Sequence, residues 1–193
     1  ANVRGSELSK EGYVDLGRRL QQAAADSTRV IEGITVSSYA SPEGAYDFNK
    51  TLAERREQTT NATVLGQLKK DKISEFGELT SQFTPEDWEG FRKLVEQSNI
   101  QDKHLILDVL SMQNDPELRE KEIRNLSGVF DELADQILPQ LRYSRVQASI
   151  NVIGKSDKQL MDLYASNPSA LTADEILYVA TLTSDNNKKM EVY

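Results

Sequence analysis

The chain contains no cysteine, which excludes disulfide bonds, zinc–thiolate sites and cysteine nucleophiles. Its only histidine, His104, lies at the start of a predicted helix, where we expect a solvent-facing or capping side chain and not a zinc ligand. Long apolar runs are also missing, since none approaches the ~18 residues that a membrane-spanning helix needs. We therefore expect no metal and no membrane insertion of this stretch of chain.

Basic residues are outnumbered by acidic ones: the chain has 23 Lys and Arg and 31 Asp and Glu, which gives a formal net charge of −8. This balance opposes association with nucleic acid or with an anionic lipid surface. Catalytic signatures are missing too, because the chain has no Gly-x-Ser-x-Gly, Walker loop, dinucleotide fingerprint or His-Glu-x-x-His. Neighbouring acids such as Glu117, Glu120 and Glu122 are interpreted as solvated helix surface. We predict that the protein is not an enzyme and has no cofactor.

The first part of the chain predicts a helix, a strand and a second helix. Apolar residues recur at helical spacing over residues 6–25. The stretch Val30–Ser38 is rich in β-branched residues and alternates, so we expect a strand that places Val30 and Ile34 on one face. Residues 49–69 then return to a helical pattern.

A helical insertion is predicted over about 84–138, after a weaker extended stretch at 73–83 that supplies a second strand. Thr84 is the expected cap of its first helix, and Pro85 suits the first helical position. Trp88 has helical spacing with apolar residues, so we expect it in the core and not stacked on a sugar. Further helices are expected over 105–112, from 116 onward and over 129–138, where Pro139 ends the last one.

The clearest strand pattern is Tyr143–Ile153, in which apolar and polar residues alternate as in a half-buried strand. Strands separated by helices predict an α/β (α+β) fold, with a mixed sheet covered by helices on one face. Residues 155–193 change to short helices, expected over 157–164, 172–183 and 186–193, with Thr172 and Glu175 as a capping box. Such a run of short helices is typical of the start of a helical repeat region. We therefore expect the chain to be a piece of a longer protein.

A polar loop, Ser41-Pro42-Glu43-Gly44, joins the first predicted strand to the helix that follows it. Together with that helix, it resembles the OmpA-like domain, in which a Thr-Asp-x-x-Gly loop precedes a helix carrying Asn-x-x-Leu-Ser-x-x-Arg-Ala. The matching positions are Gly44, Asn49, Leu52 and Arg56, with no insertion between them. The departures are Ser41 at the loop Asp, Glu57 at the small residue after the Arg, and Thr60 at the following Val.

The resemblance is to a divergent Ser-Pro-Glu-Gly branch found in Bacteroidetes envelope proteins, in which tetratricopeptide-like helices follow the domain. It implies a fold that grips the peptide stem of peptidoglycan, where the family's loop Asp and helix Arg hold the charged end of diaminopimelate. The candidate ligand-binding residues are then Ser41, Glu43, Gly44, Asn49 and Arg56.

Each of these residues has an expected role at the loop. Arg56 would project toward the loop and clamp a carboxylate, Asn49 would brace the loop, and Glu43 would replace the missing Asp. The alternative is that the loop is only a proline turn, in which Arg56 pairs with a neighbouring acid such as Glu43 or Glu57.

We accordingly expect an OmpA-like domain over residues 1–154, followed by the start of the repeat region over 155–193. The functional hypothesis is a non-catalytic cell-envelope binding module, periplasmic and outer-membrane associated, that contacts peptidoglycan or another envelope component. The alternative hypothesis is a scaffold that has lost its ligand and docks a protein partner during surface-appendage or outer-membrane assembly.

Overall fold

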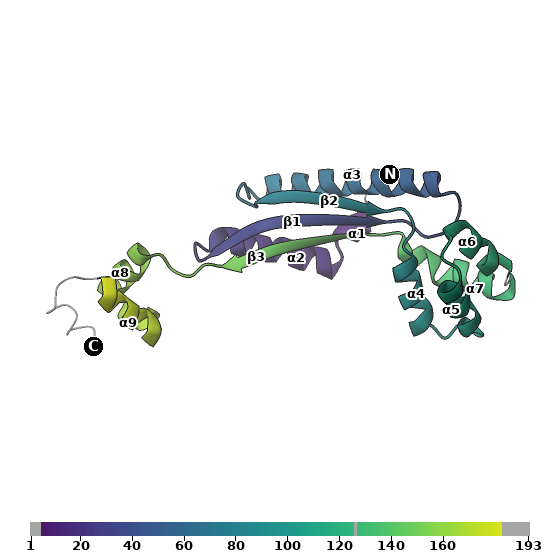
Figure 1. Ribbon diagram of the computed structural model, residues 1–193. Coiled ribbons are helices and arrows are strands. Elements are labelled where there is room, and N and C mark those ends of the chain that lie inside the picture. The colour runs from purple at the N-terminus through teal and green to yellow at the C-terminus, as the bar shows by residue number, and fades with distance from the viewer. Residues whose placement is uncertain (1–4, 126, 183–193) are drawn as a thin grey trace.

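The computed structural model describes residues 5–125 and 127–182, and the helix expected over 186–193 lies outside them. The molecule is elongated, with a sheet at its centre, a group of helices at one end and a helical pair at the other (Figure 1). Helices make up 62% and strands 16% of the structure, so the fold is α+β, as predicted.

Strand β1 (Arg29–Tyr39) is the middle strand of a three-stranded mixed sheet. It pairs in parallel with β2 (Glu78–Thr84) and antiparallel with β3 (Ser144–Val152). Because β1 is central, its carboxyl end and the loop that follows lie between the end of β2 and the start of β3.

Helices α2 (Glu11–Ala25) and α3 (Tyr46–Lys70) pack on the same face of the sheet. The residues expected to form a single helix over 6–25 are divided, because the short α1 (Gly5–Leu8) precedes α2. The opposite face of the sheet carries cross-strand polar pairs, such as Thr35 with Thr80. The shared core consists of Leu20, Ala23, Ile31, Ile34, Val36, Val64, Leu68 and Ile73.

A β-bulge in β1 changes which residues are buried. Ile31 pairs with Ile150, but Gly33 and not Glu32 pairs with the next residue of β3, so Glu32 is an extra residue in the ladder. The bulge places Ile31 on the core side, where it is 4% exposed, and leaves Val30 42% exposed. The expectation that Val30 shares the buried face of Ile34 was wrong for this reason.

The insertion contains α4 (Trp88–Gln97), α5 (Lys103–Met112), α6 (Pro116–Asn125) and α7 (Ser127–Gln136), and it ends in the 3₁₀ turn η1 (Leu138–Leu141). Its apolar side chains form a cluster that shares no residue with the core of the sheet. The buried members are Phe91, Val95, Ile100, Ile106, Leu110, Ile123, Leu133, Ile137, Leu138 and Leu141.

The first helix of the insertion starts later than predicted. Thr84 is the last residue of β2, where it pairs with Tyr39, so it is not a helix cap. Asp87 is the N-cap of α4, and its side chain accepts a hydrogen bond from the Gly90 amide at 2.8 Å. Pro85 therefore lies in the connection before the helix and not at its first position.

Beyond β3, the tail consists of α8 (Asp157–Ser166), the turn η2 (Pro168–Ala170) and α9 (Ala173–Leu182). The predicted capping box is present: Glu175 N donates to Thr172 Oγ1 at 3.3 Å, and Thr172 N donates to Glu175 Oε2 at 3.0 Å. The pair has a small core, and Leu177 and Tyr178 of α9 are each 47% exposed. Among the described residues, no helix has both the length and the apolarity needed to cross a membrane.

Candidate functional site

The loop that follows β1 lies at the junction between the sheet and the helical insertion. Ala40 ties it in place, since its amide donates to the Thr84 carbonyl at 3.0 Å and its carbonyl accepts from Asp87 N at 3.1 Å. Ser41 is 4% exposed. The start of the loop is therefore enclosed by the connections that lead into and out of the insertion.

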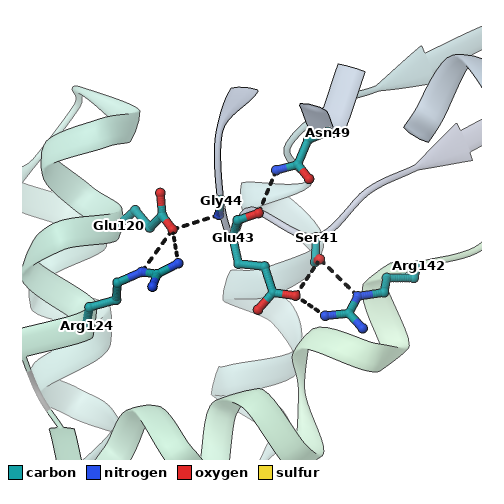
Figure 2. A network of polar contacts seen from close by, with 7 residues as sticks. All are labelled: Ser41, Glu43, Gly44, Asn49, Glu120, Arg124 and Arg142. Atoms are coloured by element: carbon teal, nitrogen blue, oxygen red, sulfur yellow. Dashed lines mark hydrogen bonds and ion pairs between the residues drawn. The ribbon is translucent and has the colours of Figure 1, made fainter. Parts of the chain in front are cut away.

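Asn49, in the first turns of α3, fixes the middle of the loop. Its side chain is buried, and Nδ2 donates to the Glu43 carbonyl oxygen at 2.8 Å (Figure 2). Gly44 follows with φ at +83°, a left-handed conformation that favours glycine. These two residues hold the loop in a shape that turns the chain from β1 into α3.

The Glu43 carboxylate is engaged by residues of the same chain. Its Oε1 accepts from Ser41 Oγ at 3.3 Å and forms an ion pair with Arg142 Nη2, while Arg142 Nε donates to Ser41 Oγ at 3.1 Å (Figure 2). Arg142 lies between η1 and β3, far from the loop in sequence but beside it in space. No local motif marks Arg142, and its only signal in the sequence is its position next to a strand that pairs with β1.

The Gly44 amide also has a partner. It donates to Glu120 Oε1 at 2.7 Å, and the same carboxylate oxygen accepts from Arg124 Nη2 at 2.6 Å. Both side chains come from α6 of the insertion (Figure 2). The interpretation of Glu120 as solvated helix surface was therefore wrong, since its side chain is only 21% exposed and caps the loop.

Arg56 reaches the end of β1 from α3. Its Nη1 donates to the Tyr39 carbonyl oxygen at 2.9 Å, and burial lowers its pKa from the ordinary value. Among the described residues, it forms no ion pair with Glu43, and Glu57 instead accepts from Asn61 Nδ2 at 2.6 Å. Arg56 thus supports the strand end from which the loop leaves.

One turn further along α3, a group of hydroxyls occupies the helix–sheet interface. Thr60 Oγ1 donates to Ser144 Oγ at 3.0 Å, and Ser144 Oγ lies 2.8 Å from Ser38 Oγ. Ser38 is fully buried. Thr60 therefore belongs to a polar contact between α3, β1 and β3.

Trp88 and His104 were also weighed as candidate site residues. Trp88 packs edge-on against Phe91, with ring centroids 5.7 Å apart, and the Arg119 guanidinium lies over it at 5.0 Å. His104 is exposed at the start of α5. Within the described ranges, no cluster of three or more His, Asp or Glu side chains is placed to hold a metal ion.

Comparisons with protein-family models, with curated proteins and with solved structures found no match to this chain. The resemblance to OmpA-like domains stays a prediction from the loop and helix residues of the sequence. The arrangement at that loop can hold a carboxylate on a backbone amide, and the Gly44 amide, the Asn49 amide group and the Glu43 carboxylate each already have a partner within the chain.

Proposed function

We propose that this chain is a non-catalytic, OmpA-like module of the cell envelope that acts as a scaffold and docks a protein partner. The observation that carries the proposal is the contact of Glu120 with the Gly44 amide, because a side chain of the same chain already occupies a donor of the candidate ligand-binding loop. A periplasmic, outer-membrane-associated location belongs to the same proposal, because it follows from the resemblance at the loop.

The charges around the loop support a scaffold over a peptidoglycan binder. Ser41 is neutral, and the nearby carboxylate of Glu43 is balanced by Arg142, so neither residue offers a free acid to a ligand ammonium. A ligand would have to break this partly exposed pair, at a cost of about 0.2–1 kcal/mol, and would also have to displace Glu120. Breaking the Glu43–Arg142 pair and displacing Glu120 both reduce the binding free energy that a ligand would gain from a new ion pair.

A second candidate function is peptidoglycan binding at the same loop, and one observation favours it. The Gly44 amide and Arg124 together accommodate a carboxylate, the group that the peptide stem presents. A stem carboxylate that replaces Glu120 would find the same two donors. In that case Glu120 would be an internal competitor of the ligand.

Co-sedimentation with purified sacculi, followed by calorimetry with diaminopimelate-containing muropeptides, separates the two functions. The variants are Ser41→Asp, which restores the family's acid, and Glu120→Gln, which removes the competing charge. Glu122→Gln is the matched control, because Glu122 is exposed on the same helix. Circular dichroism establishes that each variant folds.

The scaffold proposal expects no binding by the natural chain and none by Glu120→Gln. Tight binding by the natural chain would overturn it in favour of the peptidoglycan binder. Binding by Glu120→Gln, but not by Glu122→Gln, would also overturn it and would identify Glu120 as the competitor. A gain in Ser41→Asp alone would support the loss of ligand binding through the loop Asp.

A further inference from the structure

A groove of about 440 Å³ lies on the helical insertion. Its lining includes Trp88, Arg92 and Glu96 of α4, Leu110 of α5 and Arg119 of α6. None of the residues that line it takes part in the polar contacts of the loop after β1. The groove is therefore a surface of the insertion whose chemistry is separate from that of the candidate loop site.

Arg119 is held in place at this groove, but its hydrogen-bonding capacity is only partly used. The Cζ atom of its guanidinium lies 5.0 Å from the centroid of the Trp88 ring, and its Nε donates to the Gln113 carbonyl oxygen at 2.8 Å. The ring is itself fixed, because Trp88 Nε1 donates to Glu86 Oε2 at 3.0 Å. Among the described residues, the two terminal nitrogens of Arg119 have no acceptor. They form a pre-oriented fork of the kind that binds a carboxylate through two hydrogen bonds.

The charges at the groove leave two guanidinium groups without an acidic partner. Lys93 pairs with Glu89 at 2.7 Å, so these two charges balance one another. Arg92 is exposed one turn before Glu96 on α4, and neither Arg92 nor Arg119 forms an ion pair with any acid in the described part of the chain. The formal net charge of the chain is −8, so two unpaired cations at one groove are a local exception that favours a negative group.

We propose that this groove is the docking surface for an acidic segment of a protein partner, whose carboxylate side chain lies between Arg92 and Arg119. Charge complementarity selects this occupant. The carboxylates of Glu89 and Glu96 at the same groove repel a polyanion such as nucleic acid, whereas a single carboxylate meets two cations. Tryptophan and arginine are also enriched among the residues that dominate the binding energy of protein interfaces. The inference rests on the proposed scaffold function and names the surface that the partner contacts.

Two short peptides serve as probes, acetyl-Gly-Glu-Leu-Gly-amide and acetyl-Gly-Gln-Leu-Gly-amide, which differ only in one carboxylate. Inorganic phosphate is the third probe, because it tests for a general anion site. Trp88 is the only tryptophan of the chain, so its indole N–H signal in an NMR titration reports on this groove. We expect the Glu peptide to bind about tenfold more tightly than the Gln peptide, which is the effect of hydrogen bonds to one charged group. Phosphate at the same concentration should leave the indole signal unchanged.

Three variants locate the binding. Arg92→Gln removes one of the two cations from an exposed position, so it should leave the fold unchanged. Arg119→Lys keeps the charge but loses the planar fork that fits a carboxylate. Lys121→Gln is the matched control, because Lys121 is exposed on the same helix and points about 200° around it from Arg119. Both arginine variants should lose most of the preference for the Glu peptide, and the lysine variant should keep it. Circular dichroism establishes that each variant folds.

No binding of the Glu peptide by the natural chain, or equal binding of the two peptides, would overturn this inference. Phosphate binding as tight as that of the Glu peptide would also overturn it, because the groove would then be a general anion site. The same follows if Lys121→Gln weakens binding as much as Arg92→Gln, since net charge alone would explain the effect. Sacculus binding by the natural chain would instead overturn the scaffold function, whereas failure of the peptides without sacculus binding would remove the groove alone.

Discussion

Gly77 lies directly against the bulged part of β1. A Cβ built on it would sit 1.9 Å from the Glu32 carbonyl oxygen, and its φ of +67° is unfavourable for other residues. Gly66, in contrast, lies in α3 with nothing within 4 Å of a built Cβ. The two glycines therefore have opposite structural requirements.

We predict that Gly77→Ala lowers the free energy of unfolding by more than ~1 kcal/mol, because the backbone must shift. Gly66→Ala should raise it by about 0.5–1 kcal/mol, because alanine favours the helix. Urea denaturation of both variants measures the difference. Equal effects of the two substitutions would contradict the strained approach at Gly77.

The residues of the loop show how far a local motif predicts a site. The prediction that Asn49 braces the loop is confirmed, because its partner, the Glu43 carbonyl, lies nearby in the sequence. The sequence did not predict the partners Arg142 and Glu120, which come from segments far along the chain. Spacing patterns carry information about neighbours within one element, but not about which distant side chain fills a loop.

Among the elements, Asp87 and Asp102 precede helices in different ways. Asp87 is 6% exposed and its side chain caps α4, whereas Asp102 makes no capping bond at α5 and has φ at +57°. Asp87→Ala should destabilise the protein by about 0.5–2 kcal/mol, the usual value of an N-cap. Asp102→Gly should be neutral or stabilising, because glycine adopts the left-handed conformation freely.

Thermal unfolding of the two variants, followed by circular dichroism, checks this prediction. If Asp102→Gly lost as much stability as Asp87→Ala, the effect would come from substitution at a helix start in general and not from loss of the capping hydrogen bond. Thr84 offers a further comparison, since the structure places it in β2 and Thr84→Val should leave α4 unaffected.

Glu175 makes the tail sensitive to acid. The hydrogen bond from Lys155 Nζ, at 2.7 Å, is the main cause that lowers the pKa of Glu175, and the Thr172 amide adds to it. Because the pKa is depressed on folding, its stabilisation of the α9 start is complete at neutral pH and is lost as the pH falls through the folded value.

An NMR titration of the Glu175 side chain, compared between the natural chain and Lys155→Ala, measures this effect. The variant should titrate at higher pH, closer to an ordinary glutamate. Identical midpoints in the two proteins would show that Lys155 does not set the pKa of Glu175.

The existence and type of elements such as β3 and α4 were predictable because their apolar residues recur with the period of a strand or a helix, whereas the pattern of β2 was weak. The boundaries of the elements, and which of their residues face the core, were harder to predict. The bulge at Glu32 reverses the expected burial of Val30 and Ile31, and the bulge depends on the pairing of β1 with β3. Similarly, the start of α4 depends on β2 extending to Thr84, and no local signal fixes where a sheet ends.

At the scale of the whole molecule, two separate apolar cores predict two units of stability. Ile106 lies in the core of the insertion and Ile34 in the core of the sheet, and each is at most 1% exposed. Either residue changed to Ala should cost about 2–5 kcal/mol within its own core. We expect Ile106→Ala to accelerate amide exchange in the helices of the insertion while the strands remain protected.

Ile34→Ala serves as the matched comparison, because the same atoms are removed from the other core. It should accelerate exchange in the strands and in α2 and α3. If both variants accelerated exchange equally throughout the chain, the sheet and the insertion would unfold as one cooperative unit.

The placement of β3 has a mechanical consequence for this elongated molecule. The strand enters the sheet directly from the insertion at one end and leaves directly into the tail at the other (Figure 1). A force that pulls the insertion and the tail apart would therefore pass along the covalent backbone of β3, without relying on hydrogen bonds between strands. The sheet could then keep its pairing under tension, and the first parts to extend would be the helices outside it.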